Sequence, residues 1–327
     1  MNSSAEPEIV LIDGAAASSV SALDRGLHYG DGLFETIACL GGRARFLNLH
    51  LERLAKGCER LHLHFSGLAA LREEIERLAS PSEPSLIKVI VTRGVATARG
   101  YAPTGDESAT RVVLRYSWPQ EDPSAWRLGI SARTAAMRLG ENPGLAGLKH
   151  LSRLEQVLAR AEAGEQSASE ALMFSTSGFL VSGTMSNVFI VCAGILRTPR
   201  IERCGVAGVM RRVVLQEALR AGIAREECDL NADDLSRAEE IFITNARIGV
   251  WPLRSLDSRP LTLGPITRSI QELLSPLLAE PRHEPSPVQS TQNSESSASA
   301  QLGAAGNAIA PAPATPTAPA TDIPGRA

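Results

Sequence analysis

The stretch GLKHLSRLE, residues 147–155, joins a glycine-rich loop to a predicted helix. The loop covers residues 140–147, and apolar residues recur at helical spacing from Leu151 to Ala163. A side chain placed between a loop and a rigid helix can be directed toward a pocket. Lys149 is therefore the first residue to consider for chemistry.

Lysine is scarce in this chain, which narrows the choice further. Of the 33 basic residues only three are lysines, namely Lys56, Lys88 and Lys149. Lys56 falls off the apolar stripe of a predicted helix, as surface lysines do. Lys88 lies within an apolar strand and is a second candidate. Arginine cannot replace lysine in imine chemistry, because its guanidinium stays protonated.

The first part of the chain predicts a β layer covered by two helices. Apolar residues spaced by three and four indicate the helices, and short apolar runs bounded by glycine indicate the strands. The helices are expected over residues 47–61 and 68–78, and the strands over 9–14, 33–40, 43–47, 86–92 and 111–118. We expect this domain to cover residues 1–118.

A polar, proline-containing stretch at residues 119–125 predicts an interdomain linker, and a second domain is expected over residues 126–280. Its predicted strands are 128–134, 171–175, 188–192 and 240–244, and its predicted helices are 151–163, 209–221 and 267–278. Residues 281–327 are rich in Pro, Ala, Ser and Thr and poor in large apolar side chains, so a disordered tail is expected there.

Composition excludes several classes of function. The 327 residues include 33 basic and 36 acidic side chains, and the net charge of −3 gives no attraction to nucleic acid. The sequence has no apolar run long enough for a membrane span and no signal-peptide pattern at its start, so a cytoplasmic protein is expected. Five scattered cysteines without a CxxC pair predict neither disulfides nor a metal site.

Two features are compatible with a phosphate site. Gly205 and Gly208 precede the predicted helix that begins at Val209, and backbone amides at such a turn can bind an anion. Glycines before helices are also common as simple turn residues. Arg53, in the predicted helix 47–61, is either a phosphate ligand or a solvated surface charge. Neither feature decides the matter alone.

Several motifs in this order resemble the fold-type IV pyridoxal-phosphate enzymes, the branched-chain aminotransferase-like family, and among them most closely the aminodeoxychorismate lyases. The resemblance covers roughly residues 8–279. It rests on residues 23–36 (LDRGLHYGDGLFET), 50–54 (HLERL), 99–101 (RGY), 149–157 (KHLSRLEQV), 183–189 (GTMSNVF) and 205–212 (GVAGVMRR).

The resemblance implies an α+β fold, with a smaller α/β sandwich domain, a larger barrel-like α/β domain, pyridoxal 5'-phosphate between them and a homodimer. It implies that Lys149 binds the cofactor aldehyde and is the catalytic residue. The phosphate and ring would be held by Arg53, Ser182, Gly208, Val209, Met210, Thr244 and Asn245. Arg25, Tyr29, Arg99 and Tyr101 would lie toward a small-molecule substrate.

One position departs from the family pattern. Most fold-type IV enzymes carry a glutamate before the glycine of the GTMSN run, and this glutamate pairs with the pyridine nitrogen; here the residue is Ser182. A carboxylate favours the protonated ring and so makes it a strong electron sink, whereas a hydroxyl supplies no such charge. This difference favours an elimination over a transamination, unless Ser182 marks a weakened paralogue or another acid takes the role.

The resemblance implies conversion of 4-amino-4-deoxychorismate to 4-aminobenzoate and pyruvate, a step of folate biosynthesis, as the expected reaction. Two alternatives stay open. The first is a transaminase of the same fold acting on D-amino or branched-chain amino acids. The second is a catalytically silent dimeric binding protein.

Overall fold

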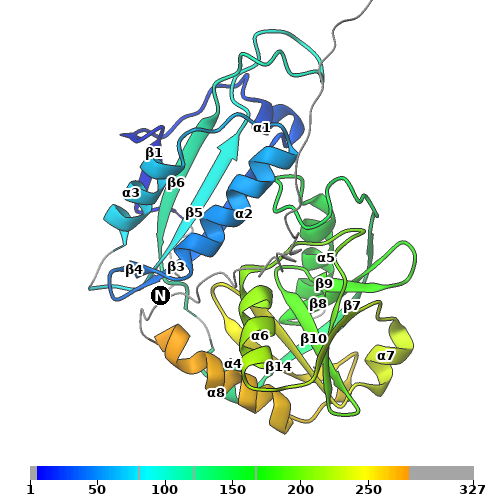
Figure 1. Cartoon of the computed structure of the whole chain (residues 1–327). Helices are drawn as coiled ribbons and strands as arrows, with labels where there is room; N and C mark the ends of the chain where they lie inside the picture. Colours follow the sequence, from blue (N-terminus) through cyan, green and yellow to red (C-terminus); the bar gives the residue numbers. More distant parts are fainter. Residues whose placement is uncertain (1–5, 80–81, 121, 166–167, 280–327) are drawn as a thin grey trace, which may run out of the picture. The chain divides into compact units, whose positions relative to one another are not determined.

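A computed structural model describes residues 6–79, 82–120, 122–165 and 168–279 (Figure 1). The first sheet has six strands in the order β2-β1-β6-β5-β3-β4, and every neighbouring pair is antiparallel. Its strands are β1 (Ile9–Ile12), β2 (Ala15–Ala16), β3 (Gly32–Leu40), β4 (Arg43–Ala44), β5 (Ser85–Thr92) and β6 (Thr110–Ser117).

Two helices, α2 (Leu47–Arg60) and α3 (Leu68–Leu78), cover one face of this sheet (Figure 1). Their apolar stripes enclose a core with the inward side chains of β3, β5 and β6, as the helical spacing predicted. The short helix α1 (Arg25–Tyr29) precedes β3. The predicted strand 43–47 is wrong beyond Ala44, because Phe46 has a left-handed φ of 52° and α2 begins at the next residue.

The second sheet is mixed and follows the order β12-β11-β10-β13-β14-β7-β8-β9, with β15 paired to β14. At its far end β9 also lies against β10 and β11, so the sheet curls into a barrel-like form. Its strands are β7 (Ile130–Leu139), β8 (Glu170–Ser175), β9 (Leu180–Gly183), β10 (Asn187–Cys192), β11 (Ile195–Pro199), β12 (Arg225–Cys228), β13 (Glu240–Asn245), β14 (Gly249–Leu256) and β15 (Arg259–Pro260).

Helices pack on the outside of the curled sheet, and its central strands are therefore buried on both faces. Along β10, Val188 and Ile190 enter the interior of the sheet, whereas Phe189 packs under the helices and stacks on Phe242 of β13. This explains the unbroken apolar runs of these strands. The helices are α4 (Ala125–Leu128), α5 (Leu154–Glu165), α6 (Val209–Arg220), α7 (Ala232–Arg237) and α8 (Pro265–Ala279).

The α+β fold with two different sheets confirms the predicted fold class. Helix α5 begins at Leu154 rather than at Leu151. Strands β2, β9, β11, β12, β14 and β15 and helices α1, α4 and α7 were not predicted. The domain limits at 118 and 126 and the linker 119–125 stay predictions, and the predicted tail 281–327 lies outside the described residues.

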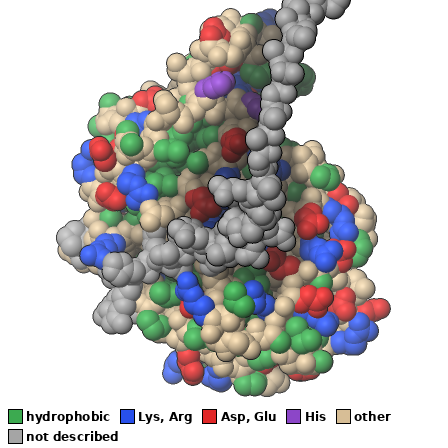
Figure 2. All heavy atoms as spheres, in the orientation of Figure 1, with side chains coloured by type: hydrophobic (Ala, Val, Ile, Leu, Met, Phe, Trp, Pro, Cys, Tyr) green, Lys and Arg blue, Asp and Glu red, His purple; other side chains and the backbone are tan. Residues whose placement is uncertain are grey.

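Acidic and basic side chains are intermixed on the face of the molecule shown in Figure 2. Such a surface offers no extended field of one sign to a polyanion. Among the described residues, no helix combines the length and apolar character needed to cross a membrane.

Candidate active site

Backbone hydrogen bonds fix Lys149 between the two sheets. On one side, the Phe34 N–H of β3 donates to the Lys149 carbonyl at 2.9 Å, and the Leu151 N–H donates to Gly32 at 3.0 Å. On the other side, the Gly147 N–H donates to Gly205 at 2.9 Å. The segment 147–151 therefore bridges β3 and the turn that opens α6, and the lysine points from this bridge.

A cavity of about 480 Å³ lies at this bridge, within the range typical of small-molecule sites. It is lined by β3 and β5 of the first sheet, by the start of α5, and by loops of the second sheet. Seven of the predicted site residues line it: Arg53, Lys149, Ser182, Gly208, Val209, Met210 and Asn245.

The environment of Lys149 makes its amine reactive near neutral pH. Burial lowers the pKa of Lys149 to about 7, and the positive charges of Arg53, Arg153 and Lys88 act in the same direction against the opposing charge of Glu35. Its Nζ lies 4.1 Å from the centre of the Phe34 ring. An amine with this pKa is half neutral at pH 7, which Schiff-base formation with an aldehyde requires.

Arg53 is oriented by a buried carboxylate rather than by solvent. Its Nε donates to Glu35 Oε1 at 2.8 Å, its Nη2 donates to Glu35 Oε2, and its Nη1 donates to the Ala207 carbonyl at 2.9 Å. Burial would raise the pKa of Glu35, but the charge of Arg53, then that of His50, and their hydrogen bonds outweigh it and lower this pKa to about 2. The guanidinium is thus fixed at the cavity wall.

His50 completes this network. Its Nδ1 lies 2.7 Å from Glu35 Oε2, and its Nε2 is buried without a partner. Burial lowers the pKa of His50 against the opposing charge of Glu35, and Nδ1–H is the donor because an ionised carboxylate can only accept. Glu35 therefore accepts hydrogen bonds from His50 and Arg53, and both residues belong to the HLERL motif.

The start of α6 provides an anion site beside Arg53. Gly208 is the N-cap and no side chain caps the helix, so the amides of Val209 and Met210 remain available to a ligand. A Cβ at Gly208 would collide with Asn187 Oδ1. Asn187 also donates from Nδ2 to Val206 at 2.9 Å, which fixes the turn. A phosphate group fits the chemistry of these donors.

Ser182 lies in the same cavity and is buried, with 8% of its surface exposed. Its hydroxyl donates to the Gly183 carbonyl at 2.9 Å, which leaves the oxygen as an acceptor. The nearby Glu170 is fully buried and binds the following loop through Thr184, Met185 and Ser186. Among the described residues that line the cavity there is no carboxylate.

Thr244 and Asn245 differ in their placement. Thr244 is fully buried, donates to the Gly249 carbonyl and does not line the cavity. Asn245 does line it and shapes the turn, because its Oδ1 accepts from Arg247 and Ile248 while Nδ2 donates to Met185 at 3.1 Å. Their roles toward a cofactor stay predictions.

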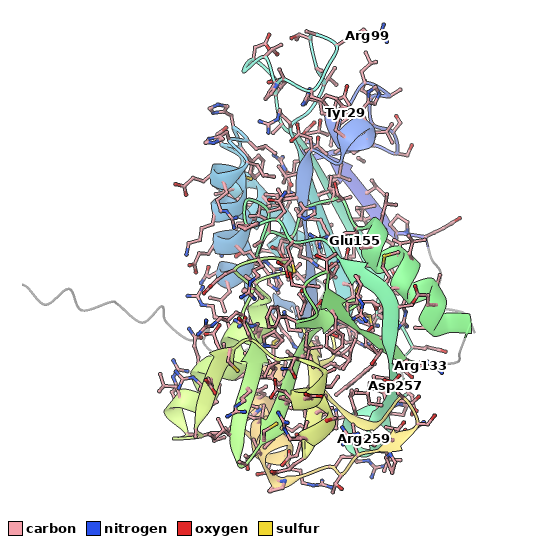
Figure 3. The ribbon with its side chains drawn as sticks, turned by 90° about the vertical axis from the view of Figure 1, so that its right-hand side faces the viewer. Tyr29, Arg99, Arg133, Glu155, Asp257 and Arg259 are labelled. Atoms are coloured by element: carbon pink, nitrogen blue, oxygen red, sulfur yellow. The ribbon has the colours of Figure 1, made fainter. Side chains whose placement is uncertain are left out.

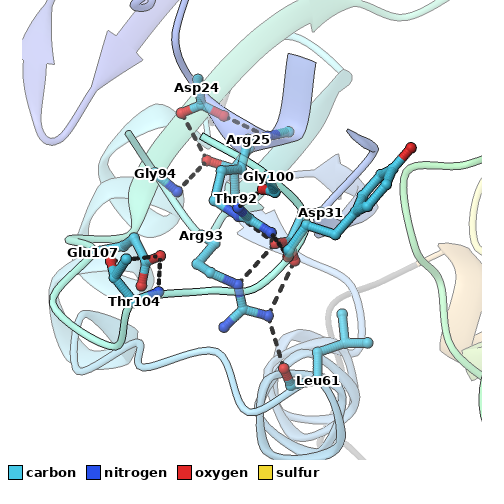
Figure 4. A network of polar contacts seen from close by, with 12 residues as sticks. Asp24, Arg25, Asp31, Leu61, Thr92, Arg93, Gly94, Gly100, Thr104 and Glu107 are labelled. Carbon is cyan, nitrogen blue, oxygen red and sulfur yellow. Dashed lines mark hydrogen bonds and ion pairs between the residues drawn. The ribbon is translucent and has the colours of Figure 1, made fainter. Parts of the chain in front are cut away.

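The four predicted substrate residues lie away from this cavity. Tyr29 and Arg99 lie toward one end of the first sheet, at the top of Figure 3. Arg25 is buried there, and its guanidinium donates to Asp31 and to the carbonyls of Gly100 and Tyr101 (Figure 4). Within one chain, none of the four lines the cavity.

Other lining residues were missed or ranked low from the sequence. Arg153 lines the cavity and donates to the His150 and Leu148 carbonyls, so it holds the lysine segment, residues 147–151, in place. Gln156 lines it with a buried, unpartnered Oε1. Both fall in the motif 149–157, four and seven residues after Lys149. At helical spacing these positions lie on the same side as the lysine, and this pattern could have identified them from the sequence.

Comparison with known proteins identifies the family. Residues 32–256 match the amino-transferase class IV family. The chain belongs to this family. The chain is 30% identical to the aminodeoxychorismate lyase of Vibrio harveyi over 80% of this chain and 97% of that protein. It is also 30% identical to the D-alanine aminotransferase of Bacillus licheniformis, over 78% and 90% of the two chains.

A solved structure with the same fold is the 4-amino-4-deoxychorismate lyase of Pseudomonas aeruginosa. Its sequence is 41% identical, the match covers 82% of this chain and 98% of that one, and the TM-score is 0.78. The chain is a pyridoxal-phosphate-dependent enzyme of class IV, which confirms the predicted cofactor and enzyme class. The buried lysine and the amides of α6 fit the aldehyde and the phosphate of this cofactor.

The lowered pKa of Lys149 predicts how its amine reacts. In apoprotein treated with acetic anhydride at increasing pH, labelling of Lys149 should rise with a midpoint near pH 7, because burial lowers its pKa to about 7. An ordinary lysine has a pKa of about 10.4. Peptide mass spectrometry separates the three lysines, and Lys56, exposed on α2, is the internal reference. Lys88→Met should raise the Lys149 midpoint, and a midpoint near 10 would contradict the prediction.

The Glu35 network predicts a pH-dependent contribution to stability. A carboxyl whose pKa falls from 4.5 unfolded to about 2 folded stabilises the protein above pH 4.5, and this contribution disappears as the pH falls through about 2. Glu35→Gln should therefore lower the free energy of unfolding at pH 7 by about 3 to 5 kcal/mol, as for a broken buried pair. The deficit should shrink below pH 4.5.

Urea unfolding at several pH values measures this effect. The control is Glu76→Gln, which removes the surface partner of Arg72 on α3. Exposed pairs contribute about 0 to 1 kcal/mol, so the control should change little. An equal loss in both variants, or a Glu35→Gln deficit that is constant from pH 7 to pH 2, would exclude the buried pair as the cause.

Proposed function

We propose that this enzyme is an aminodeoxychorismate lyase, which converts 4-amino-4-deoxychorismate to 4-aminobenzoate and pyruvate in folate biosynthesis. The observation that carries the proposal is the charge of the cavity. Arg53, Lys149, Arg153 and Arg247 line it, and no carboxylate is found among its described lining residues. Such a cavity favours a ligand with several negative charges.

The proposed substrate meets this requirement better than a simple amino acid does. It carries two carboxylates, and the cofactor phosphate adds a further anionic group. D-Alanine would bring one carboxylate only. Planar guanidinium groups pair carboxylates in bidentate fashion, which makes Arg153 a candidate ligand.

Lys88 is a second candidate for a substrate carboxylate. Its Nζ lies 5.8 Å from the centre of the Phe34 ring, the same ring that Lys149 contacts at 4.1 Å. On β5 it alternates with buried residues and shares a face with Leu86, which lines the cavity. The sequence ranked Lys88 below Lys149, and the geometry supports a role for both.

The chain's own residues can move the necessary proton. Lys149, with its pKa lowered to about 7 by burial, takes a proton from the carbon that bears the substrate amine. The bound cofactor withdraws electrons from that carbon. The protonated Lys149 then supplies a proton toward the departing enolpyruvyl group, which leaves as pyruvate. Atoms balance without a co-substrate, and the ring that remains becomes aromatic.

Ser182 supports elimination over transamination. A hydroxyl cannot stabilise a positive ring nitrogen as a carboxylate does, so the ring withdraws electrons less strongly. Transamination depends on the cofactor for storage of an electron pair. In the elimination the electron pair leaves with the enolpyruvyl group, and aromatisation supplies driving force.

We further propose that the enzyme is a homodimer. Tyr29 and Tyr101 are 38% and 84% exposed, and they form a ring pair with centroids 5.2 Å apart. Arg25 holds the loop that carries Tyr101. If these residues contact substrate, as the family resemblance implies, they reach it from a second copy of the chain.

A product assay tests the reaction. Purified enzyme with pyridoxal phosphate and 4-amino-4-deoxychorismate should release 4-aminobenzoate and pyruvate in equal amounts with no 2-oxo acid present, followed by chromatography. Lys149→Ala should abolish release of both. A requirement for 2-oxoglutarate would identify a transaminase instead, and absence of product from the wild type would favour a silent binding protein.

The role of Ser182 is tested with two variants whose new side chains have nearly the same volume but differ in charge. Ser182→Glu should increase the pyruvate released from D-alanine in a single turnover by about tenfold, the effect of one pKa unit on the ring nitrogen. Ser182→Gln has nearly the same volume without the charge and should show no increase. Thermal unfolding and cofactor absorbance check that both variants fold. Equal rates for the two variants would contradict this role.

A further inference from the structure

A second cavity of about 500 Å³ lies outside the active-site cavity, as a groove between α2 and α6. Both helices lie on the same side of the molecule in Figure 1. The groove shares only Arg53, Gly208 and Val209 with the first cavity, so it lies behind the turn that opens α6. Nothing in the reaction described above uses it.

The groove is strongly biased toward positive charge. Two carboxylates line it, Glu52 and Glu227. Glu52 accepts from Lys56 and from Arg212, and Glu227 accepts from Arg211. Six cationic side chains line the groove, and Glu35 behind its wall pairs with one of them, Arg53, so cations outnumber carboxylates by six to three: Arg53, Lys56, Arg60, Arg211, Arg212 and Arg225.

The wall of the groove contains buried polar atoms that have no hydrogen-bond partner. Arg211 has only 6% of its surface exposed, and its Nη2 donates to the Pro199 carbonyl and to Glu227. Its Nε–H is buried without a partner. A second lining residue, Gln216, likewise has a buried Oε1 without a partner. Buried donors and acceptors of this kind are rare in native proteins unless a ligand or water meets them.

The remaining lining is apolar. It consists of leucine and valine side chains of α2, α6 and the lysine segment: Leu49, Leu148, Val209, Leu215 and Leu219. Leu219 is 56% exposed although it belongs to an apolar strip. Leu49, Leu148 and Val209 are already buried, so a ligand on this strip would remove from water mainly the apolar surface of Leu215 and Leu219, which is favourable in proportion to the area.

We propose that the groove between α2 and α6 is a second ligand site, which binds a small organic anion with an apolar body, such as an aromatic carboxylate. The apolar body lies on the leucines, and the carboxylate pairs with the arginines at the rim and wall. Neither feature alone suffices, because inorganic anions lack the apolar contact and neutral aromatics lack the charge. The proposal does not rest on the reaction assigned to the first cavity.

Fluorine NMR of 4-fluorobenzoate tests the site on the holoenzyme, in which the cofactor occupies part of the first cavity, and the variants described next separate binding in the groove from binding in that cavity. The fluorine signal of 4-fluorobenzoate should broaden as protein is added, and the broadening should saturate. Neutral 4-fluorobenzamide should bind at least about tenfold more weakly, because hydrogen bonds to charged groups are stronger than those to neutral groups. Inorganic phosphate should compete poorly. Equal binding of the amide would overturn the proposal.

Variants locate the probe. Arg225→Glu, at the rim of the groove, should weaken binding by about tenfold or more, because a repelling charge replaces a pairing one. Arg220→Glu makes the same change of charge on α6 outside the groove lining and is the matched control. Lys88→Met, beside the first cavity, should leave the affinity unchanged. Unchanged affinity in Arg225→Glu, or equal weakening in Arg220→Glu or Lys88→Met, would overturn the assignment.

Discussion

The architecture of the site depends on the hydrogen bonds made by a single extended segment, residues 147–151. Its C-terminal end, Lys149 and Leu151, hydrogen-bonds to β3. Its N-terminal end, Gly147, hydrogen-bonds to the turn that precedes α6. Leu148 enters the core of the first sheet, while α5 immediately afterwards packs on β7 and β8. Lys149 is therefore positioned by both sheets at once, and any shift between them moves its amine.

Concentrated positive charge is the electrostatic consequence of this layout. Burial lowers the pKa of Lys149 most, the charges of Arg53, Arg153 and Lys88 lower it further, and the charge of Glu35 opposes them. Like charges in a partly dry cavity are unfavourable until anions arrive. The same repulsion that destabilises the ligand-free protein thus keeps the lysine amine neutral and increases affinity for phosphate and carboxylate groups.

The sequence predicted the residues that carry the chemistry of this site better than the residues that hold them in place. Lys149, Arg53 and the glycine turn lie in contiguous motifs, and the structure brings them to one cavity. Glu35 precedes Arg53 by 18 residues on another element, so no local pattern indicated their pairing. Strand β14 was missed although it is central in the second sheet, because its sequence GVWPLRSL does not alternate and contains Pro252, which argues against a central strand. Arg25 matches a family motif and supports a loop within one chain, so its role toward substrate stays a prediction.

Glu170, which lies next to the loop that follows Ser182, is engaged by other hydrogen bonds and is not placed to supply the ring carboxylate. Glu170 lies under the loop that lines the cavity, yet its oxygens accept from Ala171, Thr184 and Ser186. Moving it toward a ligand would leave these buried donors unpaired, at a cost of about 1 to 3 kcal/mol each. Glu170 therefore shapes the loop, and the placement of Ser182 at the ring nitrogen, which the family resemblance implies, stays a prediction. An enzyme built this way needs a substrate that supplies its own driving force, and aromatisation of the ring is such a force.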